Sequence, residues 1–251
     1  MTRRELYRAL SERIPRSLSE DWDNDGAMLL QDPEREVRRV LGTLDVTDEV
    51  VRYAKEGGFD LILSHHPLIF APIRALDGED PVSRRVLALL EGDVAVFSFH
   101  TRLDALSGGI NDALCAMLGL ENVSTVEGSS SIARIGTLKE PASLSSFTER
   151  LKGILGTPAL NVHAVTDRVY RVAVVGGEGK DFIGAVTASG ADTYLSGRLG
   201  YHAMLDGEIN LIECGHYYSE KHAAALLLQL LREIARDVEG EIYTPNSLRV
   251  Y

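Results

Sequence analysis

Short apolar runs alternate with amphipathic segments along the chain, a pattern typical of α/β proteins. The first residues carry apolar side chains at helical spacing up to about Arg13 and predict a helix. Residues 37–46 then predict a strand, residues 48–56 a helix capped by Thr47, and residues 59–63 a second strand. The connection between the two strands is long enough for a right-handed parallel crossover.

The second strand runs directly into Ser64-His65-His66-Pro67. Adjacent side chains on extended backbone point to opposite faces, so two neighbouring histidines suit two neighbouring metal ions better than one ion. The alternative is a turn in which both imidazoles form hydrogen bonds within the fold, and this short stretch alone favours that alternative. The remaining motifs must decide between the two interpretations.

A second strand end also carries polar side chains. Residues 94–99 predict a strand, and His100 and Asp104 follow it in a polar loop before the next helix. Ligands of open α/β sheets gather beyond the carboxyl ends of the strands. We therefore expect this loop and the His65-His66 turn to face the same crevice.

The chain repeats itself. Residues 190–196 (GADTYLS) resemble residues 58–64 (GFDLILS), and each half then has a strand, a histidine and, four residues later, an acid. These pairs are His100 with Asp104 and His216 with Glu220. We expect two α/β halves, residues 1–125 and 126–251, with a linker region at about 124–167, in one compact unit. Half-sheets related by a pseudo-dyad would bring both pairs to one site.

Several other polar features have simpler interpretations. The glycine-rich run 174–179 (VVGGEG) matches neither the dinucleotide nor the phosphate-loop motif, and we expect a turn that lets the backbone pass close to the site. His163, alone on an apolar strand, is predicted to be structural. Trp22 is predicted to pack, and residues 23–25 (Asp-Asn-Asp) to form Asx turns.

Composition narrows the function. The formal net charge of −11 argues against a broadly basic nucleic-acid-binding face. No stretch approaches the ~20 apolar residues of a membrane span, and the first residues lack the apolar core of a signal peptide, so a cytoplasmic location is expected. Cys115 and Cys214 are too few for a disulfide framework and are predicted to be reduced and buried.

The motifs LDVT, ILSHHPLIF, FHTRLDALSGGINDAL, VVGGEG, GAD-Y-SG, YH and GHYYSE occur in this order. In this the chain resembles the GTP cyclohydrolase 1 type 2-like (Nif-three-like) family, in its short form without the inserted central domain. The resemblance implies a three-layer α/β/α fold of two intertwined halves around a mixed sheet. It also implies a ring-shaped homohexamer with a dinuclear metal site in each subunit.

By this resemblance the metal ligands are His65, His66, Asp104, His216 and Glu220. Glu220 would bridge both ions, His66 and Asp104 would complete one coordination shell, and His65 and His216 the other. Nitrogen and carboxylate ligands without thiolate suit two divalent ions per subunit, whether zinc, manganese, iron, cobalt or nickel.

The chain departs from the family pattern at residues 196–198, where Ser-Gly-Arg stands in place of Thr-Gly-Asp. Arg198 offers a guanidinium that could bind a phosphate or carboxylate of the substrate, and a solvated surface arginine is an equal alternative.

These features together predict a dinuclear-metal-dependent hydrolase that acts on a nucleotide or a cyclic amide, with His100 or His202 as proton shuttle. The alternative is a non-catalytic, metal-binding oligomeric platform for regulation, metal delivery or protein interaction. A ring protein that binds nucleic acid is a weaker third interpretation, which the negative charge disfavours.

Overall fold

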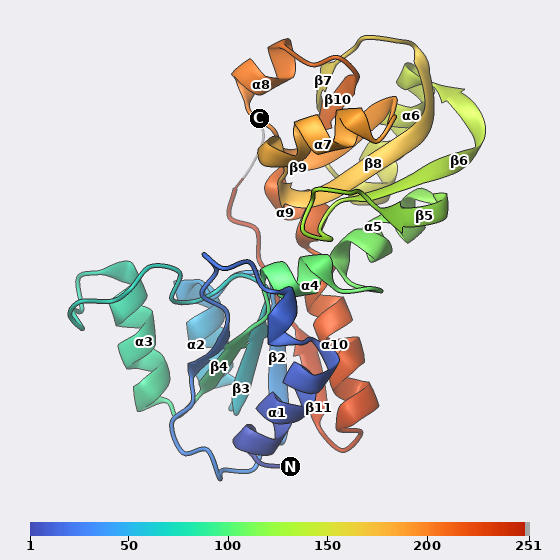
Figure 1. Ribbon diagram of the computed structural model, residues 1–251. Helices are drawn as coiled ribbons and strands as arrows, with labels where there is room; N and C mark the ends of the chain where they lie inside the picture. Colours follow the sequence, from blue (N-terminus) through green and yellow to red (C-terminus); the bar gives the residue numbers. More distant parts are fainter. Residues whose placement is uncertain (249–251) are drawn as a thin grey trace. The chain divides into compact units, whose positions relative to one another are not determined.

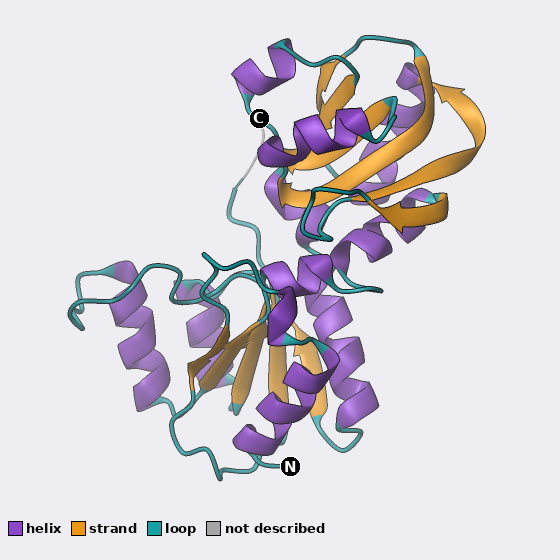
Figure 2. Cartoon of the chain, in the orientation of Figure 1, coloured by secondary structure: helices purple, strands orange, loops and turns teal. Residues whose placement is uncertain are grey.

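The computed structural model describes residues 1–248, which form two compact units (Figures 1 and 2). Unit 1 comprises Met1–Leu103 and Lys221–Ser247, and unit 2 comprises Asp104–Glu220 and Leu248. The sequence repeats place the division at residue 125 instead. The difference arises because the helices that follow the two repeats are exchanged: α5 (Ile110–Leu118) belongs to unit 2, and α10 (Ala223–Ile234) belongs to unit 1.

Unit 1 contains a five-stranded sheet in the order β1-β4-β3-β2-β11. Its strands are β1 (Gly26–Leu29), β2 (Arg39–Thr43), β3 (Leu61–Ser64), β4 (Ala95–Ser98) and β11 (Glu239–Ile242). β1 is antiparallel to β4, and the other neighbours are parallel.

Helices cover both faces of this sheet (Figure 1). They are α1 (Arg3–Arg13), α2 (Asp48–Glu56), α3 (Pro81–Glu91) and α10, with a 3₁₀ turn at Arg16–Leu18 and the start of α4 (Thr101–Ala105). Leu41, Ile62 and Val96 form one row across neighbouring strands and pack with the apolar faces of α2 and α3. The opposite face packs against α10, which also contacts α1. Unit 1 is therefore a three-layer α/β/α arrangement.

Local sequence signals account for the ends of these helices. Thr47 Oγ1 accepts a hydrogen bond from Val50 N and caps α2, as predicted, and Gly57 and Gly58 end that helix. α1 begins with a capping box, in which Thr2 and Glu5 satisfy each other's backbone N–H groups.

Unit 2 contains a six-stranded mixed sheet in the order β5-β6-β8-β9-β10-β7. Its strands are β5 (Glu121–Thr125), β6 (Arg134–Ser143), β7 (Asn161–His163), β8 (Arg168–Glu178), β9 (Thr193–Arg198) and β10 (Asn210–Glu213). Its helices are α5, α6 (Leu144–Leu155), α7 (Ile183–Ala188), α8 (Tyr201–Leu205) and α9 (His216–Glu220), with a 3₁₀ turn at Lys180–Phe182. α5 and α6 pack on one face, against a row that includes Val174, Leu195 and Ile212.

The two sheets repeat one pattern. In unit 1, Asp60 Oδ2 accepts the backbone N–H groups of Arg38 and Arg39, and its carbonyl accepts Ala95 N at the next strand. In unit 2, the Asp192 carboxylate accepts the N–H groups of residues 170 and 171, and its carbonyl accepts Asn210 N. Asp60 and Asp192 occupy equivalent positions in the two repeats, and each joins three strands of its own sheet, as expected for duplicated segments.

The predicted α/β class is confirmed, and the structure has two mixed sheets where one was expected. β1 and β11 carry no clear period-two signal and were not predicted from the sequence. The region 124–167 supplies β6 and α6 to unit 2, and Ser143 caps α6 by accepting a hydrogen bond from Ser146 N. No helix among residues 1–248 combines the length and apolar character needed to cross a bilayer.

Gly42 tests the packing of α10 on β2. A Cβ at this position would lie 2.9 Å from Leu228 Cγ and 3.2 Å from the Ala224 carbonyl oxygen. We expect Gly42→Ala to destabilise the fold by about 1–3 kcal/mol in urea unfolding, because a well-packed layer must shift.

Gly153→Ala is the matched control, since Gly153 lies in α6 with no atom near the added Cβ. It should raise the free energy of unfolding by about 0.4–1 kcal/mol. Equal stability of both variants would contradict the packing described for α10.

Candidate metal centre

His65 and His66 follow directly after β3, at the carboxyl edge of the unit 1 sheet. Because β3 ends at Ser64, the alternation of an extended strand does not extend to them, and the expectation of opposite-facing side chains is wrong. Their ring centroids lie 4.9 Å apart. One ring nitrogen of His65, one of His66 and one of His100 all lie within 4.8 Å of one another. Unit 1 thus gathers three imidazoles in one cluster.

Each of the three imidazoles is oriented by a hydrogen bond from its Nδ1. The donor–acceptor pairs are His65 with the Phe99 carbonyl (2.9 Å), His66 with Asp45 Oδ1 (2.7 Å) and His100 with Asp23 Oδ1 (2.9 Å). Carbonyl and carboxylate oxygens accept, so the proton lies on Nδ1 and the Nε2 lone pair can coordinate an ion. Histidines that bind metals in proteins are usually held in this way, so the cluster fits a divalent metal.

Asp23 fixes His100 from a segment far away in the sequence. Its buried carboxylate accepts hydrogen bonds from His100 Nδ1, from Thr101 N (3.1 Å) and from Thr101 Oγ1 (2.7 Å). Burial raises the pKa of Asp23, but the hydrogen bonds from His100 and Thr101 outweigh it and lower the pKa to about 2. Asp23 therefore stays ionised at neutral pH and keeps the His100 ring in place.

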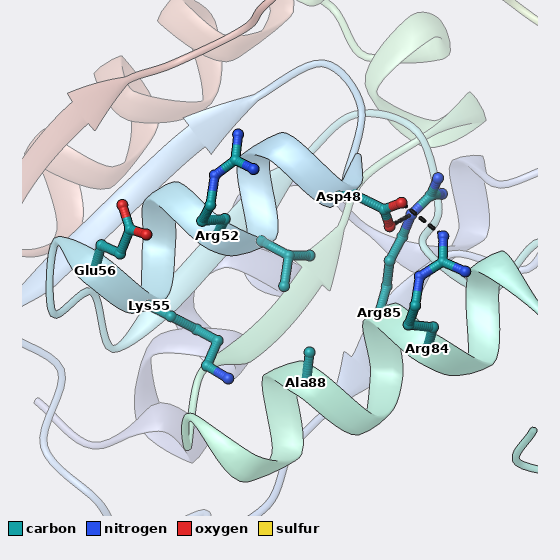
Figure 3. A pocket seen from close by; sticks show the side chains of 8 residues that line it. Asp48, Arg52, Lys55, Glu56, Arg84, Arg85 and Ala88 are labelled. Atoms are coloured by element: carbon teal, nitrogen blue, oxygen red, sulfur yellow. Dashed lines mark hydrogen bonds and ion pairs between the residues drawn. The ribbon is translucent and has the colours of Figure 1, made fainter. Parts of the chain in front are cut away.

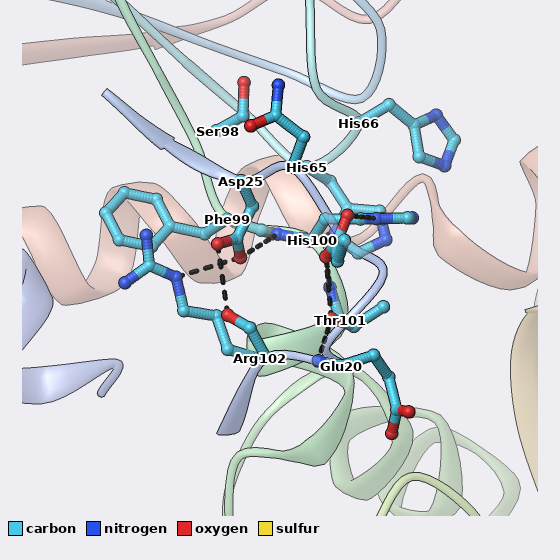
Figure 4. Close-up of polar contacts among 12 residues, drawn as sticks. Glu20, Asp25, His65, His66, Ser98, Phe99, His100, Thr101 and Arg102 are labelled. Carbon is cyan, nitrogen blue, oxygen red and sulfur yellow. Dashed lines mark hydrogen bonds and ion pairs between the residues drawn. The ribbon is translucent and has the colours of Figure 1, made fainter. Parts of the chain in front are cut away.

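Asp25 and Arg102 form a buried ion pair beside this contact (Figure 4). Arg102 Nε lies 2.9 Å from Asp25 Oδ2, and both side chains are fully buried. Arg102 also donates to the Ile14 carbonyl and lies over the Phe99 ring. Residues 23–25 were predicted to form Asx turns, but Asp23 and Asp25 bind the start of α4 instead. Such a buried pair is costly to break, so it holds this segment firmly.

Unit 2 supplies a second set of ligand types. His216 Nε2 lies 2.9 Å from Glu220 Oε2 within α9. A carboxylate oxygen of Asp104 and one of Glu220 lie within 4.8 Å of each other. Asp104 and Glu220 are buried, whereas His216 is partly open to solvent. One nitrogen and two carboxylates are again donors suited to a divalent ion.

Gly176 and Gly177, predicted to lie in a turn, belong to strand β8 instead, and the backbone there passes against this set, as the sequence predicts. Gly177 has a left-handed backbone (φ +63°), and a Cβ there would lie 2.3 Å from Glu220 Oε1 and 3.2 Å from His216 Nε2. Gly177 N also donates to Ser219 Oγ. Only glycine fits at this approach.

The repeat explains why unit 2 lacks a second histidine pair. Ser64 Oγ donates to the carbonyl two residues ahead, that of His66, whereas the equivalent Ser196 Oγ lies 3.1 Å from the Gly177 carbonyl and 3.5 Å from that of Arg198. Gly197 consequently stands where unit 1 has His65. A Cβ on Gly197 would lie 2.4 Å from Ser219 Oγ, so no ligating side chain fits there.

The other predicted site residues lie outside these clusters. His202 is exposed on α8, where its ring contacts Tyr201. Arg198 is exposed at the end of β9. Burial raises the pKa of Glu213, but hydrogen bonds from residues 200, 199 and 161, together with the charge of Arg198, lower that pKa overall. His163 Nε2 bonds to the Gly207 carbonyl, which confirms its structural role.

Cys115 and Cys214 are buried and free, as predicted. Burial raises the pKa of both thiols to about 12. Both therefore stay protonated and belong to the apolar core of unit 2, so neither offers a thiolate to a metal.

A groove of about 400 Å³ lies between α2 and α3 of unit 1 and contains none of the predicted site residues (Figure 3). Asp48 lies 2.7 Å from Arg84 and from Arg85, and hydrogen bonds from Arg85 and Arg84 lower its pKa. Lys55 pairs with Glu91. The basic side chains of the groove are thus largely neutralised by the chain itself.

The residues that orient the histidines were not predicted from the sequence. Asp23 and Asp45 contact the histidine rings, and Arg102 holds the neighbouring Asp25; all three lie within or beside recurrent motifs, but nothing in a motif gives the partner of a side chain. The sequence does contain one signal for a special role of Asp23. Residues 23–25 (Asp-Asn-Asp) place two acids directly before an apolar strand, where their spacing does not fit a helix cap.

The chain thus combines an α/β fold with a histidine cluster and a histidine–carboxylate set, each of which could hold a divalent metal ion. Residues 1–246 match the family model described as Duf34/NIF3 (NGG1p interacting factor 3), so the chain belongs to the Duf34/NIF3 family. It is 31% identical over 225 residues, 86% of each chain, to a Clostridium perfringens protein named GTP cyclohydrolase 1 type 2 homolog.

Solved structures have the same fold. A Bacillus cereus protein related to NIF3 matches with a TM-score of 0.89 at 21% identity, covering 98% of both chains. The Staphylococcus aureus hypothetical protein SA1388 matches with a TM-score of 0.89 at 26% identity, covering 98% of this chain and 97% of that one. The predicted fold family is therefore confirmed.

Asp45 provides a test of the histidine cluster. We expect Asp45→Ala to weaken the binding of Zn²⁺ or Co²⁺ by about 10- to 100-fold, because His66 loses the acceptor that sets its tautomer. Competition with a chelator measures the affinity. Asp77→Ala, an exposed acid whose Oδ1 accepts only a local backbone N–H, is the control and should bind metal as the wild type does. Equal affinity in both variants would exclude this role for Asp45.

Proposed function

We propose that the chain is a dinuclear-metal-dependent hydrolase whose two ions are held by His65, His66, Asp104, His216 and Glu220. The observation that carries this proposal is the orientation of His65, His66 and His100, each by an acceptor at Nδ1. An apolar site or a purely structural turn would not need three imidazoles that each bring a ring nitrogen to one cluster.

The path of the chain supports a common centre. Asp104 follows His100 by only four residues, through the short helix α4. A helix rises about 1.5 Å per residue, so His100, just before α4, and Asp104, within α4, are tied close together by covalent structure. Each half contributes what the other lacks, since unit 1 offers histidines and unit 2 offers buried carboxylates.

Bound ions in such a centre lower the pKa of a water molecule and polarise the bond under attack. In this proposal His100 takes up the proton at Nε2, because its Nδ1 already donates to Asp23. The ionised Asp23 stabilises the imidazolium that forms. His202, exposed on α8, is the alternative proton shuttle.

A nucleotide or a cyclic amide is the substrate class we propose, since relatives carry the name GTP cyclohydrolase 1 type 2 homolog. Arg198 is proposed to bind an anionic group of this substrate. We also propose a ring-shaped hexamer in the cytoplasm, as the family resemblance implies.

Metal counting tests whether the ligands share one centre. The wild type should hold two divalent ions per chain and hydrolyse at least one member of a panel of nucleotides, cyclic amides and phosphoesters. Glu220→Gln should lose both an ion and turnover, because Glu220 is proposed to bridge. His100→Gln should keep two ions and lower kcat by about 10²- to 10⁴-fold.

His65→Ala, from the other ligand set, should also lose ions. If each unit held a separate site, the ion losses of Glu220→Gln and His65→Ala would be additive. Glu220→Gln would then leave the metal affinity of the histidine set unchanged. Two bound ions without turnover of any panel member would favour the metal-binding platform over the hydrolase.

Arg198→Ala tests the proposed anion contact. We expect about tenfold weaker binding of guanosine 5′-monophosphate, with guanosine binding unchanged, because a charge-assisted hydrogen bond to phosphate is lost. Isothermal titration measures both ligands. Arg150→Ala, an exposed arginine on α6, is the control. Unchanged binding of the monophosphate would remove Arg198 from the site.

A further inference from the structure

Two large aromatic side chains of unit 1 are exposed beside His100. Trp22 is 62% exposed and Phe70 is 56% exposed, so the prediction that Trp22 packs inside the fold is wrong. The ring centroids of Trp22 and Phe70 lie 6.2 Å apart, and each lies 6.2 Å from that of His100. We call Trp22 and Phe70 the aromatic pair.

The backbone on either side of the aromatic pair is anchored. Asn24 Nδ2 donates to the Ile69 carbonyl at 2.5 Å and so joins the two loops that carry the rings. Asp23, next to Trp22, is buried against His100 and Thr101. Rings on such a fixed backbone lose little conformational entropy when a ligand binds.

The size of the aromatic pair favours a small ligand. Two aromatic side chains bury roughly 300–500 Å² when fully covered, and Trp22 and Phe70 expose only 62% and 56% of theirs. A stable protein interface needs about 800 Å² on each partner. A flat ring, in contrast, can stack on an indole or phenyl face and gain binding energy from contact with one or two side chains.

We propose that Trp22 and Phe70 form a stacking platform for a planar heteroaromatic ring of the substrate, beside His100. This inference rests on the proposed function, in which His100 is the proton-transfer group of a metal centre. The platform would hold the ring next to that group and make the site selective for substrates that contain a planar ring, whatever their remaining groups.

Trp22 is the only tryptophan in the chain, so its fluorescence reports directly on stacking. With the metal-loaded full chain, guanosine 5′-monophosphate should quench this emission saturably, and ribose 5-phosphate, which lacks the planar ring, should not. Phe70→Leu should weaken the binding of the monophosphate about tenfold. Leu76→Ala is the matched control, because Leu76 is 55% exposed on the same loop but has no ring.

Trp22→Leu is measured by isothermal titration and should show a similar loss. Absence of saturable quenching would overturn the platform. Emission that changes with protein concentration rather than with the nucleotide would also overturn it, and would assign the aromatic pair to an interface between copies.

The experiments can overturn the proposed stacking platform and the proposed hydrolase activity independently of each other. Glu220→Gln should retain quenching by the monophosphate while losing turnover. Quenching without turnover in the wild type would support the platform and overturn the hydrolase. Turnover of a panel member that is unaffected by Phe70→Leu and Trp22→Leu would support the hydrolase and overturn the platform.

Discussion

The buried ion pair between Arg102 and Asp25 is the contact on which the geometry of the candidate metal centre depends. Both side chains are fully buried, so removing Asp25 would leave the Arg102 charge buried without its acidic partner, at a cost of about 3–5 kcal/mol. In the sequence, Arg102 stands midway between His100 and Asp104. Its guanidinium also donates a hydrogen bond to the Ile14 carbonyl, just after α1. One contact therefore fixes the short segment that supplies both the proposed proton-transfer group and a proposed carboxylate ligand.

Duplication followed by divergence accounts for the uneven ligand sets. Asp60 and Asp192 make the same backbone contacts in the two sheets, so the scaffold of both repeats has been kept. The residues that follow the shared serine of each repeat, Ser64 in unit 1 and Ser196 in unit 2, differ. Unit 1 places two histidines there, whereas unit 2 has Gly197 packed against Ser219, with the exposed Arg198 next to it. Unit 2 has the buried carboxylates Asp104 and Glu220 instead.

Much of the fold could be predicted from local signals, because caps and periodic apolar runs act within a few residues. Thr47, Ser143 and Pro81 each begin the helix that the sequence indicates. Short strands such as β1 and β11 could not be predicted, since their pairing partners lie far along the chain. The motifs identified the clustered histidines and carboxylates, but not the acceptors Asp23 and Asp45, whose contacts with histidines depend on tertiary packing.

The central claim is that histidines of unit 1 and carboxylates of unit 2 hold two neighbouring ions. X-ray absorption spectroscopy of the metal-loaded chain tests it most directly. The account predicts a metal–metal scattering shell at about 3.5–4 Å with nitrogen and oxygen in the first coordination shell and no sulfur. A first shell of the same atoms without any metal–metal contribution, at two ions per chain, would contradict a shared centre.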